Sequence, residues 1–251
     1  MELKLDLHIH SAASVDGRMP LAQIVDAARA AGLDGAAICD HDRSFEPPSG
    51  FVPPEGFLLI PGVELSTDHG HLLGLFLERP VAADASGGAR RQLHEAVAAI
   101  RAAGGLAVLA HPFERSSGDE TAERAASELD GVEVWNGRAN RKRPDANRRA
   151  ADFARRHRLP VTAGSDAHVA REIGNGCLTL RVSERTLPAV RAALLCDAPE
   201  DAAGKNGRHV DVAKSQLSKL RRRKAGAAAY LKWLAFALRC AVTDLFRRGR
   251  G

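Results

Sequence analysis

The sequence predicts an α/β protein whose strands close into a barrel. Short apolar segments alternate with amphipathic helical patterns along most of the chain, which is typical of strand–helix repeats and a largely parallel sheet. The chain has 251 residues, of which 45% are hydrophobic, and this is enough for one sizeable core. A Gly-rich dinucleotide fingerprint and a Walker-type phosphate loop are both absent from the sequence. Seven or eight strands with intervening helices therefore favour a closed barrel over a doubly wound sheet.

The elements are expected in alternating order along the chain. The first strand shows the period of two of an extended segment, with Leu3, Leu5, Leu7 and Ile9 on one face and Lys4, Asp6, His8 and His10 on the other. Short apolar runs predict further strands at 35–39, 57–64, 71–77, 106–110, 131–135, 160–163 and 177–182. Apolar spacing and end signals, such as Pro20 and Gly32 around the first, predict helices at 20–31, 89–103, 120–129, 143–157 and 184–195.

Charge and cysteine usage narrow the class of protein. The net charge is +5, but residues 197–251 hold 13 Lys and Arg against 5 Asp and Glu, so the rest of the chain is mildly acidic. The four cysteines are far apart in the sequence and form no Cys-x-x-Cys pair, and no secretory signal precedes the first strand. We therefore expect a cytoplasmic protein.

The first strand ends in the segment Asp6-Leu7-His8-Ile9-His10, which places two imidazoles on the same face. A His-x-His pair can offer two nitrogen ligands to one metal ion. Alone, it is equally typical of two polar residues on a half-buried strand. The rest of the chain decides between these interpretations.

Other ligand-type residues lie at the ends of the predicted strands. The carboxyl ends of parallel barrel strands converge on one mouth, where active sites are found. In the predicted strand 71–77 the candidate, His71, stands at the start of the strand. His69 is an alternative candidate for the same role. Nine side chains could therefore meet in one cleft, namely His8, His10, Asp40, His41, Glu64, His71, His111, Asp166 and His168.

This mixture of ligands indicates a hydrolytic metal centre. Imidazoles with carboxylates suit Zn²⁺, Mn²⁺ or Fe²⁺, and nine candidates exceed the three or four protein ligands of one catalytic zinc ion. Two or three ions that share bridging groups are the economical interpretation, with Glu64, the lone glutamate of the set, as the bridge. Such ions can generate hydroxide at neutral pH and support displacement at phosphorus. Hydrolysis of a phosphate ester is the predicted chemistry.

The motifs resemble those of the PHP (polymerase and histidinol phosphatase) superfamily of metal-dependent phosphoesterases. The similarity covers about residues 2–195 and comprises Asp6–Ser11, Ser14–Gly17, Cys39–Asp42, Pro61–Glu64, His71–Gly74, Ala110–Pro112 and Gly164–His168, in the family's order. The resemblance implies a distorted (β/α)₇ barrel over residues 1–196, with two or three Zn, Mn or Fe ions at its mouth.

The resemblance also implies a distribution of ligands. His8, His10, Glu64 and Asp166 would bind one ion, and Glu64, His71 and His111 a second. The remaining three, Asp40, His41 and His168, would bind a third ion or line the phosphate, and they are the expected catalytic residues. A proton would come from His41 or His168. Because phosphate binding calls for fixed cations, Arg18 and Arg115, in loops that follow ligand motifs, are the expected phosphate contacts.

The loop after the first strand separates the chain from part of the family. Members similar to histidinol phosphatase have a further histidine at about the position of Asp16, whereas Ser14-x-Asp16-Gly17 is closer to the small nucleotide and phosphomonoester phosphatases. In that subgroup a threonine commonly follows the motif's second aspartate, and here Arg43 does. We expect a phosphatase acting on small phosphorylated metabolites or nucleotides. The alternatives are an exonuclease on short single strands, a histidinol-phosphatase-like activity, and a non-enzymatic metal-binding module.

Residues 197–251 are expected to form a C-terminal extension. A polar linker at 197–204 would precede a basic helix near 207–223 and a strongly apolar helix near 226–247. The apolar helix is short for a membrane span and is interrupted by Lys232, Arg239 and Asp244. Packing against the barrel or a second subunit is favoured, and peripheral contact with anionic lipid is the alternative. Nucleic acid is not favoured as a partner because the body is acidic and aromatic residues are few.

Overall fold

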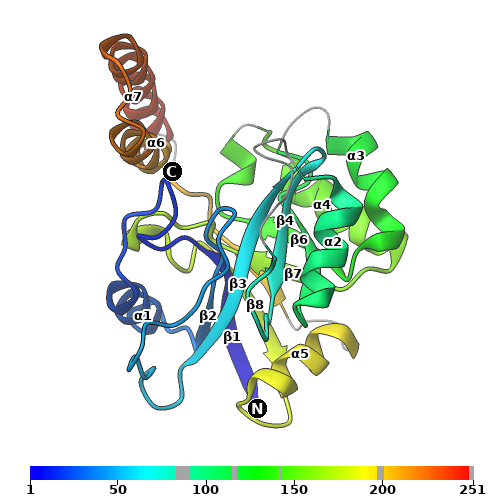
Figure 1. Cartoon of the computed structure of the whole chain (residues 1–251). Coiled ribbons are helices and arrows are strands. Elements are labelled where there is room, and N and C mark those ends of the chain that lie inside the picture. Colours follow the sequence, from blue (N-terminus) through cyan, green and yellow to red (C-terminus); the bar gives the residue numbers. More distant parts are fainter. Residues whose placement is uncertain (83–90, 115–117, 142, 197–200, 249–251) are drawn as a thin grey trace.

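The computed structural model describes residues 1–82, 91–114, 118–141, 143–196 and 201–248, and it confirms an α/β barrel with C-terminal helices (Figure 1). Its strands are β1 (Glu2–Ile9), β2 (Gly35–Ile38), β3 (Leu58–Thr67), β4 (Gly70–Leu75), β5 (Leu106–Ala110), β6 (Gly131–Asn136), β7 (Val161–Gly164), β8 (Gly176–Arg181) and β9 (Asp201–Gly204). Its α-helices are α1 (Leu21–Ala30), α2 (Leu93–Ala102), α3 (Gly118–Ala125), α4 (Ala146–His157), α5 (Leu187–Cys196), α6 (His209–Arg222) and α7 (Ala227–Arg248). Short 3₁₀ turns lie at Ala126–Glu128, Ala139–Arg141 and Ala170–Glu172.

The nine strands form a sheet in the order β7-β6-β5-β4-β3-β2-β1-β8-β9. The sheet curls back on itself, because Ile9 forms a parallel bridge with Ala167 after β7, and the amide of His10 donates to the carbonyl of Ala167 at 2.9 Å. Most neighbouring pairs from β1 to β7 are parallel, but β4 runs antiparallel to both β3 and β5. The reversal distorts the barrel. It also explains why His71 stands at the start of its strand: the start of β4 faces the same mouth as the ends of its neighbours.

A register shift in β1 changes the expected alternation of its side chains. Leu3, Leu5 and Leu7 belong to an apolar cluster drawn from strands around the sheet and from α5, which fills the barrel. Ile9 belongs to a different cluster, beneath α1. The expectation that Ile9 shares a face with the three leucines is therefore wrong. The pairing of β1 with β2 is irregular between Asp6 and Ile9, and such a bulge re-aims the side chains that follow it.

Helices cover the outside of the barrel. Figure 1 shows α2, α3 and α4 grouped on one side and α1 on the other. Apolar residues of α2 and α4, including Ile100 and Phe153, pack with the outward side chains of β3 to β6, such as Val63 and Val132. The sheet is thus buried on both faces, which holds the strand ends in fixed positions.

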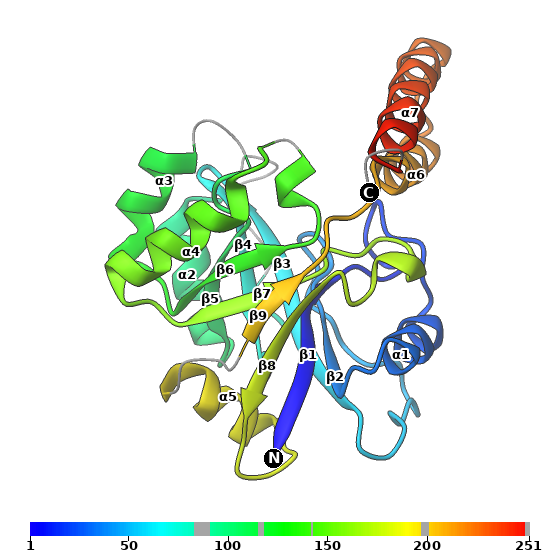
Figure 2. The same cartoon turned by 180° about the vertical axis from the view of Figure 1, so that it is seen from behind.

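The C-terminal extension starts with a strand. The described part of the predicted linker, 201–204, is β9, which pairs antiparallel with β8 from Gly176↔Gly204 to Thr179↔Asp201. The sequence did not predict this strand, because an edge strand needs few apolar side chains and the segment was expected to be a polar linker. After β9, the helices α6 and α7 pair with each other and project from the barrel as a hairpin (Figures 1 and 2). In the described residues, every helix is too short or too polar to cross a membrane.

The barrel interior makes a testable contribution to stability. Leu5 is fully buried on β1, between β2 and β8. We expect Leu5→Ala to lower the free energy of unfolding by about 2–5 kcal/mol, through lost transfer energy and an unfilled cavity. The measurement is urea denaturation followed by circular dichroism. Val52→Ala, at a position that is 82% exposed, is the control, and an equal effect of both substitutions would contradict this account of the core.

Candidate metal centre

Ligand-type side chains converge at one mouth of the barrel. The described residues contain three groups whose ligand atoms lie within 4.8 Å of one another: His8, His10 and Asp166; His41, Glu64 and His71; and His10, Asp16, His41 and His168. His10 and His41 each belong to two groups, so the three form one continuous centre. Of the nine predicted ligands, the structure brings seven into these groups.

The first group lies where β1 and β7 end. His8 Nε2 and His10 Nε2 are 3.2 Å apart, and His10 Nε2 is 3.3 Å from Asp166 Oδ1. Four ligands placed tetrahedrally at about 2.0–2.1 Å from a zinc ion would be separated by about 3.3 Å. These two separations match that geometry, while His8 Nε2 lies 3.9 Å from Asp166 Oδ1. Asp166 itself has a φ of 53°, a left-handed conformation that is uncommon for a non-glycine residue and turns the chain sharply after β7.

Glu64, on β3, lies between the groups. Its Oε1 is 2.7 Å from His71 Nδ1 and 3.1 Å from His111 Nε2, and its Oε2 is 2.9 Å from His41 Nδ1 and 3.3 Å from His10 Nε2. His111, outside the three groups above, is thus joined to them through Glu64. This is the position expected of a bridging carboxylate. His69 instead lies 3.8 Å from Asp68, so geometry favours His71 over its alternative.

The third group contains a residue that sequence reasoning did not assign as a ligand. Asp16 Oδ1 is 3.3 Å from His168 Nε2, and Asp16 Oδ2 is 3.5 Å from His41 Nε2. Ser14 donates to the same carboxylate at 2.9 Å. The signal was present in the sequence, because Asp16 stands at about the position where the resemblance to histidinol phosphatases would place a further histidine. Its loop lies outside any strand, so strand-end reasoning alone could not place it.

Several of these atoms lack hydrogen-bond partners although they are buried. His10 Nδ1, His71 Nδ1 and Glu64 Oε2 make no hydrogen bond in the described structure. Nitrogen and oxygen atoms therefore approach one another closely without the geometry of donor and acceptor. An unsatisfied buried polar group costs about 1–3 kcal/mol, so a native protein rarely retains a cluster of them. Divalent ions would satisfy these lone pairs, and the donor set fits them.

Electrostatics in the centre differ from one candidate ligand to the next. Burial lowers the pKa of His10 to about 3, and the neighbouring His168 acts in the same direction, so His10 is neutral near pH 7. Burial would raise the pKa of Glu64, but His71 and His41 hold it well below its usual range. Burial opposes ionisation of Asp166 as well, yet His8 and His10 keep the pKa of this carboxyl low. Burial opposes protonation of His41 and His111 too, yet Glu64 raises their pKa to about 11 and about 9, so a metal ion that binds there must displace protons.

Two further carboxylates hold the candidate ligands from behind. Glu133, on β6, has Oε1 2.9 Å from His8 Nδ1, while its Oε2 accepts the amide of His111 at 2.9 Å. Asp6 accepts the amides of Ser165 at 2.8 Å and Gly174 at 3.0 Å, which ties β1 to the segments after β7. Carboxylates behind metal-binding histidines fix the tautomer and ring orientation. A charged residue within the apolar run Gly131–Trp135 was the signal for Glu133.

Asp40 lies outside the three groups. Its Oδ1 accepts the amide of Ser11 at 2.7 Å, and its Oδ2 accepts the Ser11 hydroxyl at 2.6 Å. Asp40 therefore holds the start of the loop that carries Asp16. Its roles as ligand and as catalytic residue stay predictions.

The predicted phosphate contacts stay predictions as well. Arg18 is exposed, and Arg115 lies outside the described residues. Arg43 lines a hollow together with Ser11 and Asp40. These two residues are the sequence neighbours of the candidate ligands His10 and His41. Arg43 is therefore an additional candidate for contact with a substrate.

The C-terminal helix α6 holds the Asp16 loop. The Arg222 guanidinium, at the end of this helix, donates to the carbonyls of Ser14 at 2.8 Å, Ala12 at 2.6 Å and Gly17 at 3.5 Å. Three carbonyls of one short loop thus bind a single side chain from more than 200 residues away. The loop that presents Asp16 is part of a structure completed by the C-terminal extension.

The same helix also supports His168. Glu172 accepts the amide of His168 at 3.0 Å and pairs with the buried guanidinium of Arg138, which in turn donates to Ser215 on α6 at 3.3 Å. A second connection joins Arg171 to Asp211 on α6. Helix α6 therefore contacts the surroundings of the third group on both sides, at Asp16 and at His168.

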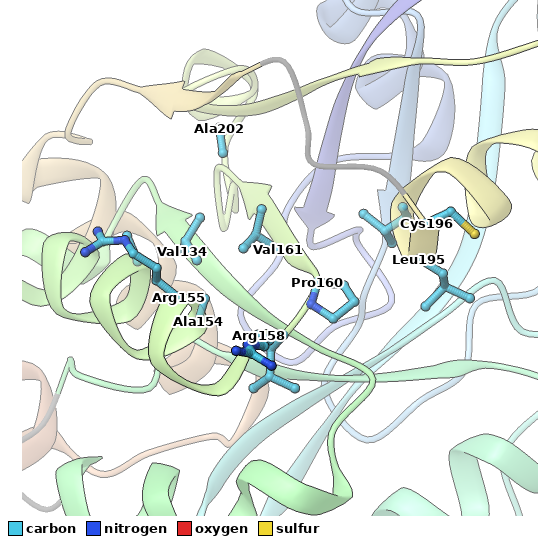
Figure 3. A pocket seen from close by; sticks show the side chains of 12 residues that line it. Val134, Ala154, Arg155, Arg158, Pro160, Val161, Leu195, Cys196 and Ala202 are labelled. Carbon is cyan, nitrogen blue, oxygen red and sulfur yellow. The ribbon is translucent and has the colours of Figure 1, made fainter.

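A separate pocket lies away from the metal centre (Figure 3). Its lining includes Pro160 and Val161 at the start of β7, Arg158 after α4, and Cys196 at the end of α5. The ligand Asp166 follows the other end of β7. None of the ligand candidates lines this pocket, so it is not part of the centre.

Comparison with protein families supports this description. A model of the PHP domain family matches residues 6–104, and a model of the PHP-associated family matches residues 144–199. An uncharacterized protein of Methanocaldococcus jannaschii is 30% identical over 180 residues, which cover 69% of this chain and 68% of that protein.

Solved structures share the fold at lower sequence identity. A two-domain protein from Bacteroides vulgatus that contains a predicted PHP-like metal-dependent phosphoesterase is 20% identical, with a TM-score of 0.58, covering 87% of this chain and 70% of that one. The lesion-specific endonuclease Q of Pyrococcus furiosus is 18% identical, with a TM-score of 0.58, covering 83% of this chain and 60% of that one. At these identities the similarity shows the fold alone.

The carboxylate behind His8 allows a first test of the centre. Glu133→Gln keeps the shape of the side chain but removes the charge that orients His8. We expect metal affinity to fall about 10–100-fold, as is usual when such a partner is lost. Competition with a chromophoric chelator measures this affinity. Glu55→Gln, at an exposed position, is the control; unchanged affinity in Glu133→Gln would contradict the assigned role.

The contact between α6 and the Asp16 loop allows a second test. Arg222→Ala removes all three hydrogen bonds to the loop, and hydrogen bonds to charged groups contribute about 1.5–3 kcal/mol. We expect the weakest-binding metal ion to be lost about tenfold more readily, measured as metal per chain by mass spectrometry during chelator titration. Arg221→Ala, at an exposed position on the same helix, should retain the metal content. Equal metal loss in both variants would show that the loop does not depend on Arg222.

Proposed function

Because this chain belongs to the PHP family of metal-dependent phosphoesterases, we propose that it hydrolyses phosphate monoesters of small metabolites or nucleotides. The observation that carries the proposal is the continuity of the three ligand groups through His10, His41 and Glu64. A single structural ion needs only one such group. Adjoining groups with shared ligands are what a reaction at phosphorus uses.

The proposed ligand sets follow the observed distances. One ion would be held by His8, His10, Asp166 and Glu64, and a second by Glu64, His71 and His111. A third would be held by Asp16, His41 and His168. When bound, Mn, Zn or Fe ions supply a hydroxide nucleophile at neutral pH and offset the charge that develops on the phosphoryl group.

The neighbouring hollow supports a small substrate. It has a volume of about 270 Å³, slightly below the range of about 300–1,000 Å³ for ligand pockets, so it has room for a small group only. Asp40 and Ser11 form one wall, and Arg43 offers a guanidinium for a phosphate oxygen. We propose Arg43, together with the earlier candidates Arg18 and Arg115, for the phosphate contact.

The hydrogen bonds of two histidines bear on the proton donor. His168 Nδ1 donates to the carbonyl of Asp166 at 2.9 Å, so a neutral His168 presents a lone pair at Nε2, which suits a ligand. His41 places its two ring nitrogens toward Glu64 and Asp16. We assign His168 to the third ion and His41 to either ligation or donation of a proton to the leaving oxygen. Asp40 would position Ser11 beside them.

A nuclease is the second candidate function. The fold is shared with endonuclease Q, and the metal requirements of phosphomonoester and phosphodiester hydrolysis are alike. The size of the hollow favours the monoester. Comparison of mononucleotides with short single-stranded oligonucleotides as substrates separates the two functions.

Removal of metal and of the bridging carboxylate tests the proposal. We expect protein dialysed against a chelator to lose phosphatase activity and to regain it with Mn²⁺, Zn²⁺ or Fe²⁺. Glu64→Gln should lower kcat by more than about 100-fold, because even residues behind the ligands contribute 10–100-fold. A screen of phosphorylated metabolites with each metal added separately measures both effects.

Two results would contradict the proposal. Metal-loaded protein that cleaves oligonucleotides but releases no phosphate from monoesters would favour the nuclease. Protein that binds metal but hydrolyses neither class of substrate would favour a metal-binding module. Glu55→Gln, at an exposed position, should keep full activity and serves as the matched control.

A further inference from the structure

Helix α7 carries an apolar stripe that no described part of the chain covers. Its large hydrophobic residues are strongly exposed, namely Leu231 at 70%, Leu234 at 59%, Leu238 at 67%, Val242 at 42%, Leu245 at 66% and Phe246 at 74%. The opposite side of the helix packs on α6, where Trp233 donates to the Ala213 carbonyl at 2.8 Å and Asp244 accepts the amides of His209 and Val210. Soluble monomers rarely leave so many large apolar side chains contiguous and exposed.

The spacing of the stripe is that of a helix-pairing seam. From Leu231 to Leu245 the steps are three, four, four and three residues, a mean of 3.5, which is the repeat that keeps apolar side chains facing a partner helix. Trp233, Cys240 and Asp244 lie on the side of α7 away from the stripe, so they do not interrupt it. The pattern therefore favours a helix as the occupant.

The stripe is also symmetric about one residue. Leu231 and Leu245 lie seven positions on either side of Leu238, and Leu234 and Val242 lie four positions on either side. In an antiparallel pair with Leu238 facing Leu238, the five members of the stripe from Leu231 to Leu245 each face an apolar member of the second copy, and Phe246 faces Tyr230. A two-fold interface requires this self-complementarity, because each contact must occur twice.

From this symmetry we propose that α7 forms an antiparallel pair with α7 of a second copy of this chain. Leu238 lies on the two-fold axis, Leu231 packs against Leu245 of the second copy, and Leu234 packs against its Val242. The dimer thus buries a face that the monomer leaves in water.

The arrangement of the hairpin permits this pair. Helices α6 and α7 project from the barrel, so the stripe is not obstructed by the body of the molecule (Figures 1 and 2). The metal centres of such a pair belong to separate barrels, and neither requires residues from the other copy.

Charges beside the stripe allow the antiparallel orientation. The nearest cation to the two-fold axis is Arg239, whose guanidinium lies 5.6 Å from the centre of its own Phe236 ring and thus on the side of its own helix. A parallel pair would place Lys232 opposite Lys232, where like charges repel, whereas the antiparallel pair separates the two Lys232 residues by about 18 Å at 1.5 Å per residue. An anionic membrane would also attract these cations, but it would not require the symmetric spacing.

The oligomeric state of the full chain tests the proposal. We expect light scattering after size-exclusion chromatography to give a dimer for the natural sequence at micromolar concentration. Leu238→Glu, which places two carboxylates on the axis, should give a monomer with an unchanged circular dichroism spectrum and unchanged metal content. Leu238→Met is the conservative control and should remain a dimer.

Cross-linking tests the orientation in a Cys196→Ser background, which removes the exposed cysteine. A short bismaleimide should join Leu238→Cys chains to each other. It should not join Leu231→Cys chains to each other, because residues fourteen positions apart on a helix are separated by about 21 Å at 1.5 Å per residue. A mixture of Leu231→Cys and Leu245→Cys chains should cross-link.

Three outcomes would overturn the proposal. A natural chain that stays monomeric at high micromolar concentration has no such interface. Efficient cross-linking of Leu231→Cys to itself would show a parallel pair. A monomer that co-sediments with phosphatidylserine vesicles, and loses this binding in Leu238→Glu, would assign the stripe to an anionic membrane.

Discussion

The structure depends on the Glu64 carboxylate and the imidazoles that surround it. His41, His71, His111 and His10 all lie within 3.3 Å of its oxygens, yet Glu64 Oε2 and two of the ring nitrogens make no hydrogen bond among the described residues. Such a buried cluster is costly unless cations occupy it. The barrel brings these groups together at strand ends, where only the surrounding imidazoles offset the charge of the buried carboxylate. Metal binding and the stability of this mouth are therefore coupled.

The strand ends themselves are strained to make the centre. His111 has a φ of 31° and Asp166 a φ of 53°, and non-glycine residues in this region cost on the order of 1–3 kcal/mol. The surrounding hydrogen bonds hold them there. Glu133 binds the amide of His111, and Asp6 binds the amide of Ser165 beside Asp166. In the sequence, Glu133 and Asp6 are only polar residues within strands. In the structure, their carboxylates fix the backbone at two of the candidate ligands.

Much of this could be predicted from the sequence, because metal ligands at strand ends leave a local signal. An apolar run followed by His, Asp or Glu is visible without a structure, and apolar spacing with end signals indicates the helices of the barrel. What could not be predicted depends on contacts between distant segments. The bulge in β1 can be recognised only from the register of β1 with β2, and β9 only from its pairing with β8. The arginine of α6 and the Asp16 loop are also brought together only by the fold.

The three ligand groups consequently differ in how they are held. The first two are built mostly from residues on or directly after strands, whose positions are set by the hydrogen bonds of the sheet. The third needs Asp16 from one loop and His168 from another, and both loops are fixed by side chains of α6. Loop positions vary more readily than strand positions, so differences among related proteins should concentrate at this third group. The C-terminal extension thus supports both loops of the third group, because side chains of α6 contact the segment that carries Asp16 and the surroundings of His168.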